Sequence, residues 1–354
     1  MVPKQPESPS ASGKAPPSLH DVAGLAGVSV ATASRVLSGS SHPVSDKTRA
    51  KVLAAAESLS FVPNRLARAL VTARSQTVGV IVHDISDPYF GDIVKGLEDG
   101  IHADDYRLFV ASSDRDPDKE LNYVRAFDAY QVDAIVFAAS SFTDPDYIAE
   151  LQRLAARFQG RGGVIVQLSD HFLEGPRVRF DNRRSAADMV GYLAGRGHTR
   201  IGYISGPPDL AVSRVRLAGF EAAVAELGLS AGPEYVVDGR FNVEGGREAI
   251  ARLLEQVDVT AVLAANDLMA IGATRQLLSA GRAVPDEISV AGIDDIAIAE
   301  YGPVPLTTMR IPTYQVGMQG ASLLLEALGG GDPGDARLEG EIVERESVAD
   351  FRPD

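Results

Sequence analysis

The stretch from Ser18 to Leu37 reads S-L-H-D-V-A-G-L-A-G-V-S-V-A-T-A-S-R-V-L, and the interpretation of the whole chain starts from it. Ser18 followed by Asp21 three residues later is the pattern of a helix capping box. Gly27 supplies the conformational freedom for a turn, and Ser29 is a typical cap for a second helix. The sequence therefore predicts two short helices joined by a tight turn, an arrangement that can place its second helix in the major groove of DNA.

Apolar residues at helical spacing extend this unit to three helices. A third helix is expected from the Ser45 cap to about Leu59, and residues 18–62 together form a small helical headpiece. Residues 1–17 are rich in Pro, Ser, Gly and Lys and are expected to be disordered. Residues 63–76 form a basic hinge helix or linker. The expected core positions are Leu19, Val22, Ala23, Ala26, Ala33, Val36, Leu37, Val52, Leu53, Ala56 and Leu59.

Charge is divided unevenly along the 354 residues. The formal net charge is −14, yet residues 1–75 hold nine Lys or Arg against four Asp or Glu. That segment therefore carries +5, which leaves −19 on the remainder. A basic front attracts phosphate, whereas an acidic body repels nucleic acid. Charge blocks can also serve solubility alone, but next to a helix–turn–helix they favour DNA binding.

Composition excludes several other classes. The chain has no cysteine, so it has neither disulfides nor thiolate metal sites, and its six histidines are scattered. It has no apolar run of the ~18 residues that a membrane span needs, and no apolar signal segment at its start. We therefore expect a cytoplasmic protein without membrane contact.

From residue 77 to 354, apolar strands alternate with helices. Two such series predict two doubly wound parallel sheets, an α/β body of two lobes with a cleft between them. The helices are expected to begin near Tyr89, Pro117, Tyr147, Ser185, Val212, Val243 and Leu268. The strands are expected at 77–82, 107–112, 134–139, 163–168, 178–181, 200–205, 261–265 and 288–292.

Polar residues follow several of these strands, where ligands of such sheets bind. Carboxylates accept hydrogen bonds from hydroxyl groups, Arg donates them, and aromatic rings cover C–H faces. This set suits a neutral polyhydroxyl ligand. Asp267 and Asp295 are more typical of helix caps than of ligand contacts. The candidate ligand-binding residues are His83, Asp84, Phe90, Asp181, Arg216, Phe241, Asn266 and Asp294.

The sequence does not favour an enzyme. Paired acids could serve glycoside hydrolysis, but nothing in the sequence raises the pKa of one carboxyl group or sets their separation. Nucleophile-elbow, P-loop and dinucleotide-binding patterns are absent from the sequence. A plain solute-binding module would share the two-lobed body, but residues 18–75 and the missing signal segment argue against it.

The chain resembles the lactose-repressor (LacI/GalR) family of bacterial transcription regulators. The likeness lies in D-V-A-G-L-A-G-V-S-V-A-T-A-S-R-V-L, V-S-D-K-T-R-A-K-V and F-V-P-N-R-L-A-R-A-L. In the body it lies in V-G-V-I-V-H-D-I-S-D-P-Y-F, R-L-A-G-F, A-A-N-D-L-M-A-I-G-A, I-S-V-A-G-I-D-D and P-L-T-T-M-R. The resemblance implies a periplasmic-binding-protein-like body. Lobe 1 would comprise about 77–175 plus 306–328, and lobe 2 about 176–305 plus 329–354.

The resemblance also implies a homodimer, usually a repressor, on a pseudo-palindromic operator. Val30, Ala31 and Arg35 would face base edges, with Arg35 able to bind guanine. Ser29, Thr32 and Ser34 would hold phosphates. Asn64, Ala67 and Leu70 of the hinge would also contact DNA, Leu70 by wedging into the minor groove. The effector would be a sugar or sugar derivative and no cofactor is implied. Whether it releases or promotes DNA binding stays open.

Overall fold

The computed structural model describes residues 17–37, 42–62, 74–169 and 171–352. The predictions for residues 1–16, and for Asn64, Ala67 and Leu70 of the hinge, lie outside the described residues. The chain divides into two compact units, one ending at Ser75 and the other beginning at Gln76, and each is described by itself.

The first unit contains the three predicted helices: α1 (Leu19–Ala26), α2 (Val30–Leu37) and α3 (Asp46–Ser58). Ser18 and Asp21 form the expected capping box, and Gly27 ends α1 with a left-handed φ of 67°. Ser45 caps α3 through the Thr48 backbone N–H. Val22, Ala33, Val36, Val52 and the small residues around them form the core. Leu53, expected in that core, is 50% exposed, and Ala55 is buried in its place.

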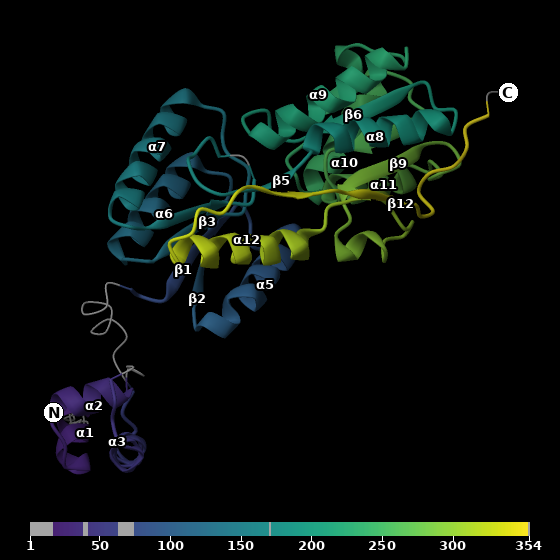
Figure 1. The fold of residues 1–354 in the computed structure, drawn as a ribbon. Coiled ribbons are helices and arrows are strands. Elements are labelled where there is room, and N and C mark those ends of the chain that lie inside the picture. The colour runs from purple at the N-terminus through teal and green to yellow at the C-terminus, as the bar shows by residue number, and fades with distance from the viewer. Residues whose placement is uncertain (1–16, 38–41, 63–73, 170, 353–354) are drawn as a thin grey trace, which may run out of the picture. The chain divides into compact units, whose positions relative to one another are not determined.

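Lobe 1 of the second unit is built on a parallel four-stranded sheet in the order β2-β1-β3-β4. Figure 1 labels β1, β2 and β3 of this sheet. Its strands are β1 (Thr77–Val82), β2 (Arg107–Ser112), β3 (Ala134–Phe137) and β4 (Val164–Gln167). Its helices are α5 (Pro88–Ile101), the short η1 (His102–Asp104), α6 (Pro117–Ala129), α7 (Pro145–Gly160) and α12 (Thr313–Leu328). Buried Val, Ile and Phe side chains fill the central strands, as parallel sheets covered on both faces require.

Lobe 2 is built on a six-stranded sheet in the order β12-β10-β9-β8-β6-β7. All of its pairs are parallel except β10 with β12. Its strands are β6 (Ile201–Ser205), β7 (Val236–Asp238), β8 (Ala261–Ala264), β9 (Ser289–Asp294), β10 (Thr307–Arg310) and β12 (Glu341–Val343). Its helices are α8 (Asn182–Gly195), α9 (Ala211–Glu226), η2 (Pro233–Tyr235), α10 (Val243–Gln256), α11 (Asp267–Ser279) and η3 (Ala297–Ala299).

The crossings between the lobes correct two sequence expectations. We placed residues 306–328 in lobe 1, but β10 pairs with β9 in the lobe 2 sheet, so the chain returns only after Arg310. The strand expected at 178–181 is β5 (Val178–Phe180), which pairs with β11 (Ala336–Leu338) in a separate two-stranded ribbon. A short strand such as T-T-M-R can form its backbone hydrogen bonds equally well in either sheet. Only the observed strand pairing shows which sheet it belongs to.

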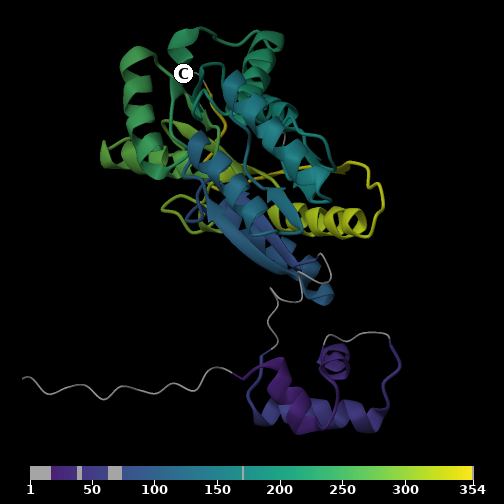
Figure 2. The ribbon, with the colours of Figure 1, turned by 90° about the vertical axis from the view of Figure 1, so that its left-hand side faces the viewer.

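Helix α12 packs along α5 in lobe 1. Figure 2 shows α12 as the yellow helix. Glycines bring the two helices close together. A Cβ atom on Gly317 would lie 2.1 Å from the Ile93 carbonyl oxygen and 2.6 Å from the Leu97 nitrogen. Backbone atoms cannot move aside as a flexible side chain can, so this position excludes any larger residue.

Replacing Gly317 with Ala should therefore lower the free energy of unfolding by roughly 1–3 kcal/mol, because the added methyl group overpacks the helix contact. Gly91→Ala on α5 is the matched control, because a Cβ there meets no atom within 4 Å. That variant should gain about 0.5–1 kcal/mol from reduced backbone entropy. Chemical denaturation of both variants measures the difference, and equal stabilities would contradict the packing argument.

Candidate ligand cleft and nucleic-acid interface

Helix α2 exposes one face that carries mostly small side chains. Ala31, Ser34 and Arg35 are exposed, Val30 and Thr32 are half-buried, and the opposite side is buried in the three-helix core. The exposed Ser29 hydroxyl accepts from the Thr32 backbone N–H at 3.1 Å and pairs with the Thr32 hydroxyl at 2.9 Å. A helix face of this kind can lie close to base edges, because nothing bulky holds it away from the groove floor.

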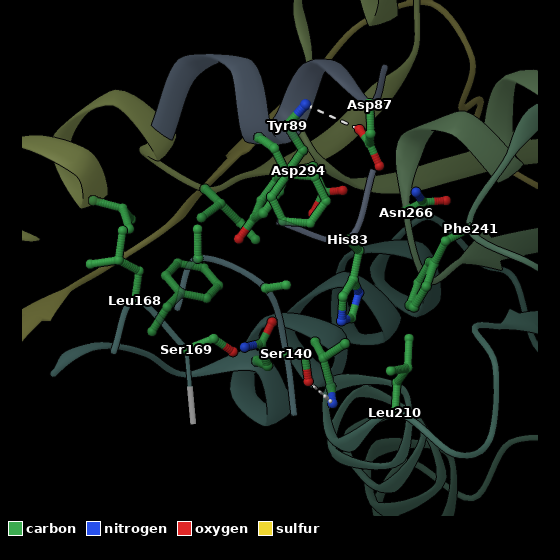
Figure 3. Close-up of a pocket in the computed structure, with 18 of the residues that line it drawn as sticks. His83, Asp87, Tyr89, Ser140, Leu168, Ser169, Leu210, Phe241, Asn266 and Asp294 are labelled. Carbon is green, nitrogen blue, oxygen red and sulfur yellow. Dashed lines mark hydrogen bonds between the residues drawn. The ribbon is translucent and has the colours of Figure 1, made fainter. Parts of the chain in front are cut away.

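The cleft lies between the carboxyl ends of the two parallel sheets and encloses about 830 Å³ together with its open mouth. Figure 3 shows side chains of both lobes converging on this space, His83 and Tyr89 from lobe 1 and Phe241 from lobe 2. Six predicted residues line it: His83, Phe90, Arg216, Phe241, Asn266 and Asp294.

Arg216 organises the lobe 2 wall. It projects from α9 and is 4% exposed. Its Nη2 donates to Asp294 Oδ1 at 3.1 Å, its Nε donates to Asn182 Oδ1 at 2.9 Å, and its Nη1 donates to the Ala265 carbonyl oxygen. Burial raises the pKa of Asp294 well above its ordinary value, while the Arg216 guanidinium opposes that shift. The wall therefore presents a rigid, internally paired cation and carboxyl group.

The lobe 1 wall contains a neutral histidine and a second paired arginine. His83 is 3% exposed, and burial lowers its pKa to about 4, so its ring is uncharged at neutral pH. Its Nε2 atom is buried without a hydrogen-bond partner among the described residues. Arg115 lies 3.8 Å from Asp87 and 4.0 Å from Asp84. A neutral imidazole beside balanced charges favours an uncharged polar ligand over a charged one.

Three cleft residues have strained backbones. Asp294, Phe241 and Arg115 adopt φ values of 130°, 53° and 57°, in the left-handed region that ordinary residues avoid. Such strain persists only where the surrounding structure imposes it, and it concentrates at functional sites. Its effect here is to direct a carboxylate, an aromatic ring and a guanidinium toward the same space.

Two predicted residues do not line the cleft's inner space. Asp84 accepts hydrogen bonds from the Ser86 backbone N–H at 2.9 Å and from its hydroxyl at 2.6 Å, which forms a local turn. Asp181 is exposed and caps α8 by accepting from the Arg184 backbone N–H at 2.9 Å. Their near neighbours Asp87 and Asn182 line the inner space. Both carboxylates therefore bond within their own turns, and Asp181 lines the wider space that adjoins the cleft at Ser169, Phe180 and Asn182.

Other lining residues were not singled out from the sequence. Asp87, Tyr89, Arg115, Ser140 and Ser169 all lie in or just after loops that follow lobe 1 strands. Ligands of such sheets bind beyond the carboxyl ends of the strands, and this principle predicts that these loops line the site. It gives no information on which of several polar residues in a loop faces the ligand. Asn266 has two roles, because its Oδ1 caps α11 through the Met269 N–H at 3.0 Å while its side chain lines the cleft.

Asp267 differs from its expected role as a helix cap. It is fully buried behind the cleft, where Thr308 Oγ1 donates to its Oδ1 at 2.5 Å and the Ile296 N–H donates to its Oδ2 at 3.0 Å. Burial raises the pKa of Asp267 to about 7, against 3.8 for an ordinary aspartate. Asp295, the other expected cap, instead forms ion pairs with Arg310 and Arg345.

Asp267→Asn should reveal this shift as a pH-dependent stability difference. The folded chain retains the proton that an unfolded aspartate loses near pH 4, so the stability contributed by protonated Asp267 is lost as pH rises from about 4 to about 7. The free energy of unfolding of the variant minus that of the parent should increase across this window, by about 1.4 kcal/mol for each pKa unit. Denaturation at several pH values measures it, with the exposed Asp286→Asn as control. A difference that stays flat would contradict the assignment.

Among the described residues, no cluster of three or more His, Cys, Asp or Glu side chains is placed to hold a metal ion. Within the same parts of the chain, no helix combines the length and the apolar character that crossing a bilayer demands.

Comparison with known proteins agrees with this geometry. Residues 18–64 match the family described as bacterial regulatory proteins, lacI family, and residues 190–348 match a periplasmic binding protein-like domain. The HTH-type transcriptional repressor CytR of Escherichia coli (strain K12) is 32% identical over 333 residues, which cover 93% of this chain and 96% of CytR.

Two solved structures are similar over nearly the whole chain. A lac repressor dimer bound to operator and the anti-inducer ONPF has a TM-score of 0.81 and 26% identity, covering 95% of this chain and all of that one. A complex of the transcriptional regulator CelR with cellobiose has a TM-score of 0.65 and 29% identity, covering 94% and 99% of the two chains.

Proposed function

This chain belongs to the lacI family of bacterial regulatory proteins, and from that premise we propose which residues contact its two ligands. It is a DNA-binding transcriptional regulator controlled by a small-molecule effector, and not an enzyme. The observation that carries the proposal is the combination of a small-residue helix face on α2 with a two-lobed cleft whose charges are already paired.

We assign DNA reading to α2. Arg35 is its exposed cation and would bind guanine through two hydrogen bonds, while Ala31 and Val30 would contact thymine methyl groups. Ser29, Thr32 and Ser34 would hold the phosphate backbone on either side. As in the lac repressor dimer on its operator, two copies of this chain would present two α2 helices to the halves of a pseudo-palindromic site. Because the operator of a bacterial gene lies in the cytoplasm, we place the protein there.

Arg35→Ala should lower affinity for an operator obtained by in vitro selection, by about 1–3 kcal/mol. Affinity for random duplex should change little, because phosphate contacts carry non-specific binding. Lys51 is an exposed cation on α3, and Lys51→Ala is the matched control for the loss of one positive charge. Fluorescence anisotropy on both DNAs distinguishes the cases, and equal losses on the two DNAs would rule out a base contact by Arg35.

We further propose that the effector is an uncharged sugar or sugar derivative. Arg216 donates hydrogen bonds to Asp294 and Asn182, and the charge of Arg115 is balanced by Asp87 and Asp84 at 3.8 and 4.0 Å, so neither arginine leaves a net positive charge for an anionic ligand. The amide of Asn266 lines the cleft and can meet hydroxyl groups, and the Phe241 ring can cover an apolar sugar face. The complex of CelR with cellobiose is consistent with this class of ligand. No cofactor enters the proposal.

The effector would act by changing how the two lobes sit on each other. A ligand that touches both walls favours the arrangement in which the walls approach, and it shifts the population by its difference in affinity for the two arrangements. In a dimer, that change would alter the spacing of the two α2 helices and hence operator affinity.

Calorimetric titration of the full-length protein with a panel of neutral sugars and their phosphates tests the effector class. At least one neutral sugar should bind more tightly than its phosphate ester. Arg216→Ala should weaken the binding of that sugar by about 10- to 100-fold, because it removes the guanidinium from the cleft wall and leaves Asp294 buried without its partner, and hydrogen bonds to a charged group contribute about 1.5–3 kcal/mol. Arg214→Ala, an exposed arginine two residues earlier on α9, should leave affinity unchanged. Preference for the phosphorylated member of every pair would refute the uncharged ligand.

A further inference from the structure

Two loops from opposite lobes pair with each other across the cleft. Residues 140–143 follow β3 in lobe 1, and residues 209–212 comprise the end of the loop before α9 and the first two residues of that helix in lobe 2. We call this pair of segments the clasp. Phe142 and Leu210 form an antiparallel β-bridge at its centre. The Thr143 N–H and hydroxyl donate to the Asp209 carbonyl oxygen at 2.8 and 3.1 Å, the Ala211 N–H donates to the Ser141 carbonyl oxygen at 2.9 Å, and the Val212 N–H donates to Ser140 Oγ at 3.0 Å.

The two side chains at the centre of the clasp are buried. Phe142 is 2% exposed and Leu210 is fully buried. The Phe142 ring packs against Tyr147 with ring centroids 5.0 Å apart and against the cleft residue His83 at 5.6 Å. The hydrogen bond from Ala211 to the buried Ser141 lies beside these side chains, whereas the hydroxyl bond from Thr143 to Asp209 is exposed. Hydrogen bonds shielded from water are stronger than exposed ones, and leaving their partners unpaired is costly.

The clasp is also continuous with the ligand site. Ser140, Leu210 and Val212 line the cleft, and Figure 3 shows the Ser140 and Leu210 side chains at its edge. Ala211 is the first residue of α9, the helix that carries Arg216 one and a half turns later. Helix α9 therefore contacts lobe 1 through its first residues and carries Arg216, the main cation of the lobe 2 wall.

The clasp differs in kind from the covalent crossings between the lobes. The chain passes from lobe to lobe after β4, after β10 and after α12, and these connections persist whatever angle the lobes adopt. The clasp is held by non-covalent contacts alone, so it must break if the lobes separate at this edge. A second cross-cleft contact accompanies it, with the Arg115 guanidinium 6.0 Å from the centre of the Phe241 ring.

We propose that the clasp is a latch: its contacts stabilise the arrangement in which the two lobes lie close together, relative to the one in which they are apart. Effector binding in turn depends on the fraction of molecules in the close arrangement. The link to the effector rests on the proposed function. The latch itself does not, because its contacts are all within the chain. A ligand that needs the approached lobes binds with an apparent affinity reduced by the fraction of molecules in which they are apart, so the clasp helps determine the working effector concentration.

Ala211→Pro removes one clasp donor while suiting the local backbone. Proline is favoured at the first position of a helix, and α5, α6 and α7 of this chain begin with it. Leu210 has φ −94° and ψ 134°, an extended conformation that a residue before proline prefers. The substitution deletes the N–H and places a ring carbon against the Ser141 carbonyl oxygen, so it acts selectively against the clasp.

The chain has no cysteine, which allows site-specific spin labelling of the full-length protein. Labels at Ala149→Cys on α7 and Ala222→Cys on α9, two exposed positions in different lobes, report the distance between lobes by double electron–electron resonance. Diluting labelled with unlabelled chains restricts the measurement to pairs within one chain. The parent should show mainly the short distance. Ala211→Pro should raise the ratio of long to short distances about tenfold, the effect of losing about 1.4 kcal/mol.

Two controls accompany it. Val243→Pro introduces the same ring at the first position of α10, after an extended Asn242, and should match the parent. Thr143→Val removes the hydroxyl bond to Asp209 and should raise the ratio about two- to fivefold, whereas Thr143→Ser retains the hydroxyl and should not. If Ala211→Pro fails to fold by circular dichroism, the Thr143 pair decides.

A parent that already populates the long distance, or Thr143→Val and Ala211→Pro both matching the parent, would overturn the latch. An equal shift in Val243→Pro would show a general helix effect and would also overturn it. No ligand or DNA is present in this measurement. Failure of every sugar in the calorimetric panel would therefore refute the proposed effector class while leaving the latch standing.

Discussion

The buried guanidinium of Arg216 is the contact on which the ligand-binding half of this molecule depends. It joins the first residue of α8, the residue after β8 and the last residue of β9, three points that are far apart in sequence. Burying a cation and a carboxyl group is costly, and an apolar pair of equal volume would often be as stable. What the ion pair provides here is a fixed orientation of three strand and helix ends around one space.

Strain and pairing reinforce each other in the same region. Asp294 holds an unfavourable backbone conformation so that its carboxyl group meets Arg216, and Asp267 is buried behind it with both oxygens bonded. Because α9 also starts in the clasp, movement of lobe 1 at residues 140–143 bears directly on the helix that holds Arg216. Ligand contact and lobe movement therefore share one structural element.

The two units of the chain divide their tasks by charge. The basic excess lies within residues 1–75, and the acidic excess lies in the body. An acidic body is repelled by DNA phosphates, so the electrostatic attraction to the duplex comes from residues 1–75. The interior of the cleft departs from the acidic character of the body because each of its carboxylates Asp87 and Asp294 faces an arginine.

Local chemistry determined what could be predicted from the sequence alone. The Ser18–Asp21 capping box, the Gly27 turn and the Ser45 cap depend on residues within a few positions of each other, so the headpiece helices were predicted almost to the residue. The alternation of apolar strands with helices likewise predicted two parallel sheets and the loops that line the cleft. The identity of the family followed from the motifs.

Only the tertiary structure decided which member of each polar pair faces the ligand space. Asp84 and Asp181 are held by neighbours in their own turns, while Asp87 and Asn182 face inward because partners from distant segments, Arg115 and Arg216, lie there. The placement of β10 in lobe 2 and the pairing of the two clasp segments were likewise decided by tertiary contacts. Each rests on hydrogen bonds between residues tens of positions apart, and no local pattern in the sequence specifies such partners.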